Sequence, residues 1–172
     1  MNNRVVEVVD YDPIWQKTFE AEKQLLLDAI GQNAVIIEHM GSTAVKGLPS
    51  KPVIDILVEV TSILDLEISS KKIQALGYIV KGENGITGRR YFQKGGNQRS
   101  HHVHAFKTGD LNLIRHRAFK EYLIAHPMIA IEYGDIKKNS ALNCENDINI
   151  YMEHKNNFIQ KHEKIAVVWF NS

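Results

Sequence analysis

The sequence predicts an α+β domain built on a mixed or antiparallel β-sheet, and the order of its segments is the main reason. Strand-like segments dominate the first two thirds of the chain, and helical periodicity dominates the last third. With 172 residues, 44% of them hydrophobic, the chain fits one domain with a substantial core. We therefore expect a single domain over residues 1–172, with helices that flank the sheet and a helical C-terminal third.

The first segments predict a strand, a helix and a second strand. Residues 5–9 form a short apolar run that is typical of a strand. Asp12 can cap a helix that has Pro13 at its first position, where the missing N–H of proline costs nothing. Gly31 is typical of a helix C-terminus, and residues 34–38 indicate the next strand. The predicted buried stripe of the helix contains Trp15, Phe19, Leu26 and Ile30.

Residues 53–60 predict a strand whose two faces differ in chemistry. Successive strand side chains point to opposite faces, so Asp55 and Leu57 lie on one face and four aliphatic residues lie on the other. We expect the aliphatic face to pack on helices and Asp55 to point to the more open face. The aliphatic residues are Ile54, Ile56, Val58 and Val60.

The remaining segments add a hairpin and the helices of the last third. The predicted helices span residues 62–75, 110–124, 127–142 and 147–162, and an apolar tail follows at 165–170. The predicted strands span residues 78–80, 89–94 and 101–107, and a glycine-rich loop lies at 82–88.

Composition excludes several classes of protein. Lys and Arg total 21 against 20 Asp and Glu, a balance that argues against an extended nucleic-acid surface. The single cysteine, Cys144, permits neither an intramolecular disulfide nor a cysteine-based zinc site. No segment resembles a signal peptide or a membrane span, so we expect a cytoplasmic protein.

A small-residue turn and an acid are the strongest functional signal. Gly41, Ser42 and Thr43 form a turn ahead of the strand that carries Asp55. The backbone N–H groups of such a turn can bind phosphate, and the carboxylate can hold a divalent cation beside it. The alternative is an ordinary tight turn with a buried, hydrogen-bonded aspartate.

This arrangement resembles the signature of the nucleotidyltransferase superfamily. The resemblance implies that the turn binds the phosphates of a nucleotide, and that acids on the strand hold magnesium during phosphoryl transfer. The superfamily strand carries two acids in alternation, but Leu57 stands at the second position here. A catalytically reduced or purely ligand-binding domain is therefore an alternative to an active enzyme.

A longer set of motifs resembles the GrpB family of nucleotidyltransferase-like proteins. The motifs are residues 41–56, residues 88–92, the His-Val-His of 102–104 and residues 115–119, followed by Tyr-Leu and His-Pro pairs at 122–123 and 126–127. They span most of the chain in the family's order, which implies the nucleotidyltransferase-like fold. The family also occurs fused to dephospho-CoA kinase, which implies a nucleotide or coenzyme A context.

His102 and His104 alternate within one predicted strand, so both side chains emerge on the same face, about 7 Å apart at the backbone. Two imidazoles at this spacing can converge on one cation. We hypothesise that Asp55, His102 and His104 form one metal site that favours manganese or zinc over magnesium, with a histidine as ligand or general base. The alternative is a pair of hydrogen-bonded histidines in a polar groove.

Four cationic residues are candidates for phosphate contacts: Lys51, Arg89, Arg90 and Arg115. A guanidinium group binds phosphate through two parallel hydrogen bonds, which makes arginine suited to this role. The alternative for each is a solvated or salt-bridged surface residue.

The leading hypothesis is a nucleotidyltransferase-fold protein that binds a nucleoside triphosphate or related phosphorylated ligand with Mg²⁺, Mn²⁺ or Zn²⁺. Asp55 and His104 are its candidate catalytic residues, and the reaction is transfer of a nucleotidyl group to an unidentified acceptor. Two alternatives remain open: a non-catalytic nucleotide- or CoA-binding module, and a metal-dependent phosphohydrolase.

Overall fold

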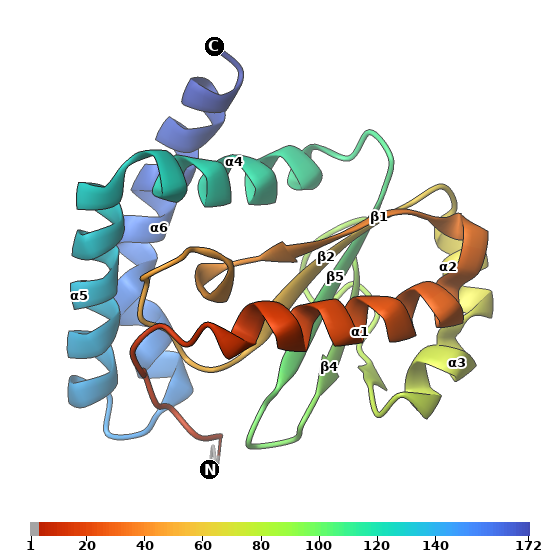
Figure 1. Cartoon of the computed structure of the whole chain (residues 1–172), viewed down its shortest axis with the longest axis horizontal. Helices are drawn as coiled ribbons and strands as arrows, with labels where there is room; N and C mark the ends of the chain where they lie inside the picture. The colour runs from red at the N-terminus through yellow and green to blue at the C-terminus, as the bar shows by residue number, and fades with distance from the viewer. Residues whose placement is uncertain (1–3) are drawn as a thin grey trace.

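The computed structural model describes residues 4–172 and has a β-sheet at its centre (Figure 1). This sheet has five strands. The strand order is β1-β2-β5-β4-β3, in which β2 and β5 run parallel and the other neighbours run antiparallel. The predicted mixed sheet is therefore confirmed. The strands are β1 (Ala34–Met40), β2 (Ile54–Val60), β3 (Ile79–Val80), β4 (Arg90–Lys94) and β5 (His101–Lys107).

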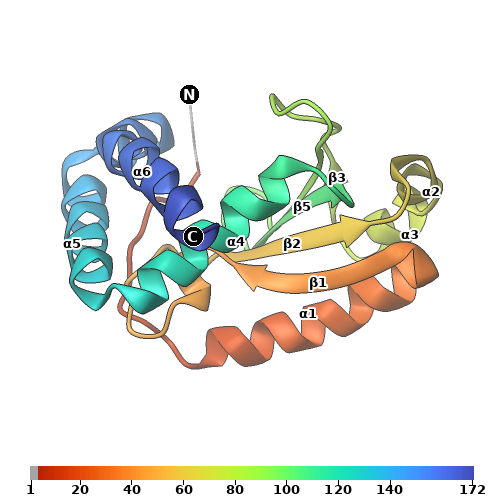
Figure 2. The same cartoon turned by 90° about the horizontal axis from the view of Figure 1, so that it is seen from above.

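Helices lie on both faces of this sheet and at one end of it. Figure 2 shows α1 (Ile14–Ile30) along one face and α4 (Leu111–Ala125) on the opposite side, with α5 (Pro127–Asn143) and α6 (Ile148–Phe170) beside the sheet. Two short helices, α2 (Ile63–Ile68) and α3 (Ser70–Ala75), and two 3-10 turns, η1 (Gly31–Asn33) and η2 (Ser42–Ala44), complete the chain. The predicted helical C-terminal third is confirmed. Within residues 4–172, no helix combines the length and apolar character needed to cross a membrane.

The main core lies between α1 and the aliphatic face of β2. Ile54, Ile56, Val58 and Val60 are each 2% exposed or less and pack in one cluster with the α1 stripe. Asp12 Oδ1 accepts the Ile14 N–H at 3.0 Å just before α1, although the helix begins at Ile14, one residue after the predicted first position at Pro13. The two-residue alternation of β2 therefore decides which side chains enter the core.

The opposite face of β2 is divided between an apolar patch and a polar site. Leu57 is fully buried in a cluster with Met40, Phe106 and Leu113, beneath α4. Asp55, two residues earlier, lies outside that cluster at the edge of a cavity. The missing second acid is thus replaced by a structural leucine that connects the sheet to α4.

The predicted strand at 5–9 is wrong for the described residues. Only Val9 pairs, through a single bridge in which it exchanges two 2.9 Å backbone hydrogen bonds with Ser50. Pro49 and Pro52 flank that partner, and a proline has no N–H with which to extend a ladder. The predicted domain also includes residues 1–3, which lie outside the described residues.

Two helix predictions also need correction. The helix expected over 62–75 is interrupted at Ser69, whose hydroxyl donates back to the Asp65 carbonyl at 3.3 Å and competes with the helical pattern. The expected apolar tail is instead the last part of α6. Ala166 is buried there and Trp169 contacts Tyr122 of α4, so packing against α4 extends the helix to Phe170.

Candidate functional site

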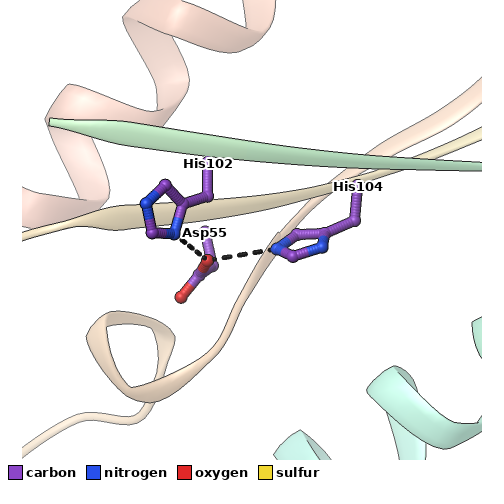
Figure 3. Close-up of side chains that lie close together, drawn as sticks. All are labelled: Asp55, His102 and His104. Carbon is purple, nitrogen blue, oxygen red and sulfur yellow. Dashed lines mark hydrogen bonds and ion pairs between the residues drawn. The ribbon is translucent and has the colours of Figure 1, made fainter. Parts of the chain in front are cut away.

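Asp55, His102 and His104 meet at the polar edge of the parallel strand pair. Asp55 lies directly opposite His102 in the β2–β5 register, and His104 lies two residues further along β5. Asp55 Oδ1 is 3.4 Å from His102 Nδ1 and 3.3 Å from His104 Nε2 (Figure 3). The predicted convergence of these three side chains is therefore present in the fold.

The two histidines act on the charge state of Asp55. Burial raises the pKa of the Asp55 carboxyl, but the hydrogen bonds from His102 and His104 outweigh it and hold the pKa well below its usual range. The Asp55 side chain is 33% exposed, against 14% and 16% for the histidines. These hydrogen bonds therefore favour the ionised carboxylate of Asp55 at the edge of the cavity.

Gly41 brings the turn into contact with this carboxylate. Its φ of +71° is favourable only for glycine, and a Cβ at this position would lie 2.6 Å from Asp55 Oδ2. No other residue type fits there without moving Asp55. The turn and the acid, which are separated in the sequence, are thus in contact in the structure.

A cavity of about 470 Å³ opens in front of Asp55, between the sheet and helices α5 and α6. Seven of the ten predicted site residues line it: Gly41, Ser42, Lys51, Asp55, Arg89, His102 and His104. Its size and the charged side chains on its wall suit a small charged ligand.

Three lysines on the cavity wall pair with no carboxylate of the described residues. Lys51, Lys137 and Lys155 all line the cavity, and among residues 4–172 no ion pair includes any of them. Lys137 is 2% exposed and its Nζ has no hydrogen-bond partner within the described residues. Instead, Lys51 and Lys155 lie 4.9 and 5.0 Å from the Tyr151 ring, and Lys137 lies 5.0 Å from the Tyr133 ring.

Burial perturbs all three lysines in the same direction. It lowers the pKa of Lys51 to about 7 and that of Lys155 to about 8, and it holds the pKa of Lys137 well below its usual range. Lys155 contributes further to the lowering at Lys51 and Lys137, because neighbouring positive charges disfavour each other. An anion in the cavity would raise the pKa of each lysine and so oppose both effects.

Arg89 belongs to the same site. It is 7% exposed, and its guanidinium is fixed by the carbonyl oxygens of Glu83 and Asn84 at 3.1 and 2.7 Å. It also lies over the Tyr91 ring, and its Nη1 is 3.3 Å from His104 Nδ1. The glycine-rich loop therefore positions a buried guanidinium at the cavity.

Comparison with known proteins identifies the family. The model of the family described as GrpB protein matches residues 5–164. The chain belongs to the GrpB family. UPF0157 protein YqkA of Bacillus subtilis is 43% identical over 166 residues, which cover 96% of this chain and 48% of YqkA. The crystal structure of conserved protein GrpB from Enterococcus faecalis has a TM-score of 0.93 and 39% identity, and covers 96% of this chain and 100% of that chain.

A longer protein also contains a region similar to this GrpB-family chain. A dephospho-CoA kinase of Mycolicibacterium paratuberculosis is 26% identical over 192 residues, which cover 97% of this chain and 47% of the kinase. The chain thus spans about half the length of YqkA and of this kinase.

Three predicted ligand-binding residues of this GrpB-family chain do not line the cavity. Arg90 points outward and pairs with Glu67 of α2 at 2.8 Å. Arg115 pairs with Glu163 at 3.3 Å, so a carboxylate stands between it and the cavity. Thr43 is buried, and its hydroxyl lies 2.8 Å from His39 Nε2.

Sequence reasoning missed Lys137 and Lys155, although the sequence contains a signal for both. Each lies four residues after a tyrosine, in the pairs Tyr133–Lys137 and Tyr151–Lys155. Residues four apart share one face of a helix, so each lysine lies on the same face as a tyrosine. Lysine is rarely buried unless it meets a partner, so a lysine on an aromatic face that packs inward indicates a polar site. The repeated Tyr-x-x-x-Lys spacing on two consecutive helices therefore indicates two lysines that face the same polar site.

Proposed function

We propose that this GrpB-family chain binds a nucleoside triphosphate or a related phosphorylated ligand in the Asp55 cavity, together with a divalent cation. The observation that supports this most strongly is the set of three cavity lysines, which form no ion pair within residues 4–172 and of which Lys137 is buried. A buried ammonium group is costly unless a counter-charge offsets it. A multiply charged phosphate chain supplies that counter-charge to Lys51, Lys137 and Lys155 at once.

The opposite wall of the cavity provides complementary groups. Gly41 and Ser42 offer the start of a turn for phosphate, and Arg89 adds a guanidinium. Asp55 is the proposed carboxylate ligand of Mg²⁺, Mn²⁺ or Zn²⁺. Within the Asp55–His102–His104 cluster, ligand atoms from all three side chains lie within 4.8 Å of one another.

Transfer of a nucleotidyl group is the proposed reaction of this site. A divalent cation supplies charge neutralisation to a transferring phosphoryl group. Asp55 would hold the ligand next to the turn, and the cationic residues would keep its phosphates in place. His104 is a catalytic candidate from the sequence, and its Nε2 lies 3.3 Å from Asp55 Oδ1.

A non-catalytic nucleotide- or CoA-binding module is the second candidate. Leu57, at the position of the second acid, is fully buried in an apolar cluster and does not reach the cavity. The name of the longer relative, dephospho-CoA kinase, supports a CoA-related ligand for this version of the proposal.

Calorimetric titration with ATP, coenzyme A and inorganic tripolyphosphate, each with Mg²⁺ or Mn²⁺, tests the proposal. The Lys155→Met variant removes one cavity charge, and Lys161→Met removes an exposed charge from the same helix. We expect the first to weaken binding by about 10–100-fold, since a charged hydrogen bond contributes about 1.5–3 kcal/mol. The second should leave binding unchanged.

The products distinguish the candidate reactions. Release of pyrophosphate from ATP indicates nucleotidyl transfer, release of inorganic phosphate indicates a phosphohydrolase, and binding without turnover indicates the module. If none of the phosphorylated compounds binds, or if Lys155→Met binds as tightly as the wild type, the proposal is wrong.

A further inference from the structure

In both His102 and His104, the ring nitrogen that points away from Asp55 lies next to arginine. His102 Nε2 lies 3.1 Å from Arg99 Nη1 and 3.4 Å from Arg4 Nη2. His104 Nδ1 lies 3.3 Å from Arg89 Nη1. Each imidazole is therefore placed between a guanidinium on one side and the Asp55 carboxylate on the other.

This placement determines where each ring carries its proton. A guanidinium nitrogen can only donate, so the ring nitrogen that faces it must accept. The remaining nitrogen of each neutral ring then carries the hydrogen and points at Asp55 Oδ1. His102 is thereby held as the Nδ1–H tautomer and His104 as the Nε2–H tautomer.

The same placement does not suit metal ligation by the histidines. A histidine that binds a metal does so through a lone pair, and its other nitrogen usually donates to a carboxylate or carbonyl. Here a metal on the inner nitrogen would turn the outer N–H of each ring toward arginine donors. Arg89 is fixed by two backbone carbonyls, so it cannot easily turn away.

We infer that His102 and His104 are positioning residues that donate N–H groups to Asp55 and do not bind the cation themselves. Both donors meet Oδ1, which leaves Oδ2 as the oxygen next to Gly41 and the turn. The cation then takes oxygen ligands only, from Asp55 Oδ2 and from the phosphates of the ligand. The choice of cation rests on the proposed function, whereas the tautomers do not.

An all-oxygen site has a definite metal preference. Carboxylate and phosphate oxygens suit Mg²⁺ and Mn²⁺, whereas imidazole ligands favour Zn²⁺. We therefore expect a hard cation that binds together with the phosphorylated ligand. In the absence of other ligands, Zn²⁺ should bind the wild-type protein no more tightly than it binds a variant that lacks the His104 imidazole.

Nitrogen-15 NMR of the wild-type imidazoles tests the tautomers without any substitution. We expect a protonated Nδ1 and a bare Nε2 in His102, and the reverse in His104. A bare inner nitrogen in either ring would overturn the inference. This measurement needs no ligand, so it decides the inference even if no phosphorylated compound binds.

A pair of variants tests the role of His104. In His104→Gln the amide N–H₂ can donate to Asp55 while the amide oxygen accepts from Arg89, whereas His104→Leu removes both contacts. Mn²⁺ binding is measured by paramagnetic resonance in the presence of tripolyphosphate, and Zn²⁺ binding is measured alone. We expect Mn²⁺ affinity to be unchanged in the glutamine variant and to fall about 10–100-fold in the leucine variant.

If His104 binds the metal instead, both variants should lose Mn²⁺ affinity to the same extent, and Zn²⁺ affinity should fall in His104→Gln. That result would overturn the inference. Failure of wild-type protein to bind tripolyphosphate would contradict the proposed function instead, while the tautomer result would stand.

Discussion

The two faces of β2 use the same strand for opposite purposes. On the α1 side, every second residue is aliphatic and buried in the main core. On the other side, Leu57 is also buried, but Asp55 faces a cavity with unpaired lysines. The comparison teaches that the main core and the proposed ligand site lie on different faces of β2, and that one face is itself divided between apolar packing and the proposed site.

This separation has an energetic consequence. Apolar burial on the α1 side stabilises the fold, whereas a desolvated lysine that forms no ion pair within residues 4–172 destabilises it unless a bound ligand supplies a counter-charge. Substitutions on the two sides should therefore change the free energy of unfolding in opposite directions.

The largest effect is expected on the α1 side. Ile56→Ala creates a cavity in the core and should lower the free energy of unfolding by about 2–5 kcal/mol. Urea unfolding measures this change, and tripolyphosphate binding by the folded variant should remain as in the wild type. A loss of ligand affinity as large as that of Lys155→Met would show that the two faces are not independent.

Lys137→Met should act in the opposite direction. Removing a buried amine that lacks a hydrogen-bond partner should raise the free energy of unfolding by about 1–3 kcal/mol, while tripolyphosphate binding weakens. Thermal and urea unfolding with and without tripolyphosphate measure both effects. A destabilised variant would mean that Lys137 stabilises the ligand-free fold.

Two glycines with the same backbone angle isolate the contact with Asp55. Gly31 and Gly41 both have φ +71°, but a Cβ at Gly31 meets nothing within 4 Å, whereas one at Gly41 meets Asp55 Oδ2 at 2.6 Å. Gly31→Ala should lower the free energy of unfolding by about 1 kcal/mol because of backbone strain. Gly41→Ala should lower it by about 2 kcal/mol and also abolish cation binding. If both variants lose the same free energy of unfolding in urea and Gly41→Ala still binds the cation, then the close approach of Gly41 to Asp55 has no role in the site.

The cavity lysines also predict a pH dependence. The pKa of Lys51 is lowered to about 7 in the folded state, so between pH 7 and its usual value the unfolded chain binds more protons. Stability should therefore rise with pH across this window, by on the order of 1 kcal/mol for each pH unit, and Lys51→Met should flatten the rise. Urea midpoints at pH 7 and 9 provide the test, and tripolyphosphate affinity should fall over the same range. A flat wild-type profile would contradict the burial of an unpaired ammonium.

Arg90 should have the smallest effect. Its ion pair with Glu67 is at the surface, with side chains 23% and 49% exposed, so Arg90→Gln should change stability by less than about 1 kcal/mol. Tripolyphosphate titration should show unchanged affinity. Weaker tripolyphosphate binding by Arg90→Gln would show that Arg90 does contribute to the ligand site.

The sequence by itself predicted the features that depend on local periodicity. The two-residue repeat of residues 53–60 separated Ile56 from Asp55, and the His-x-His spacing placed both imidazoles on one face. These predictions succeeded because a strand imposes the alternation on each residue regardless of its partners. The motif at 41–56 also indicated the contact between turn and acid.

Only the tertiary structure decided which distant side chains join these features. The parallel register of β2 and β5 placed His102 opposite Asp55, and the packing of α5 and α6 brought Lys137 and Lys155 to the same cavity. The same packing extended α6 to Phe170, and an ion pair with α2 turned Arg90 away. Periodicity acts along a few neighbouring residues, whereas strand pairing and helix packing join segments far apart in the chain, so a single sequence contains the first but not the second.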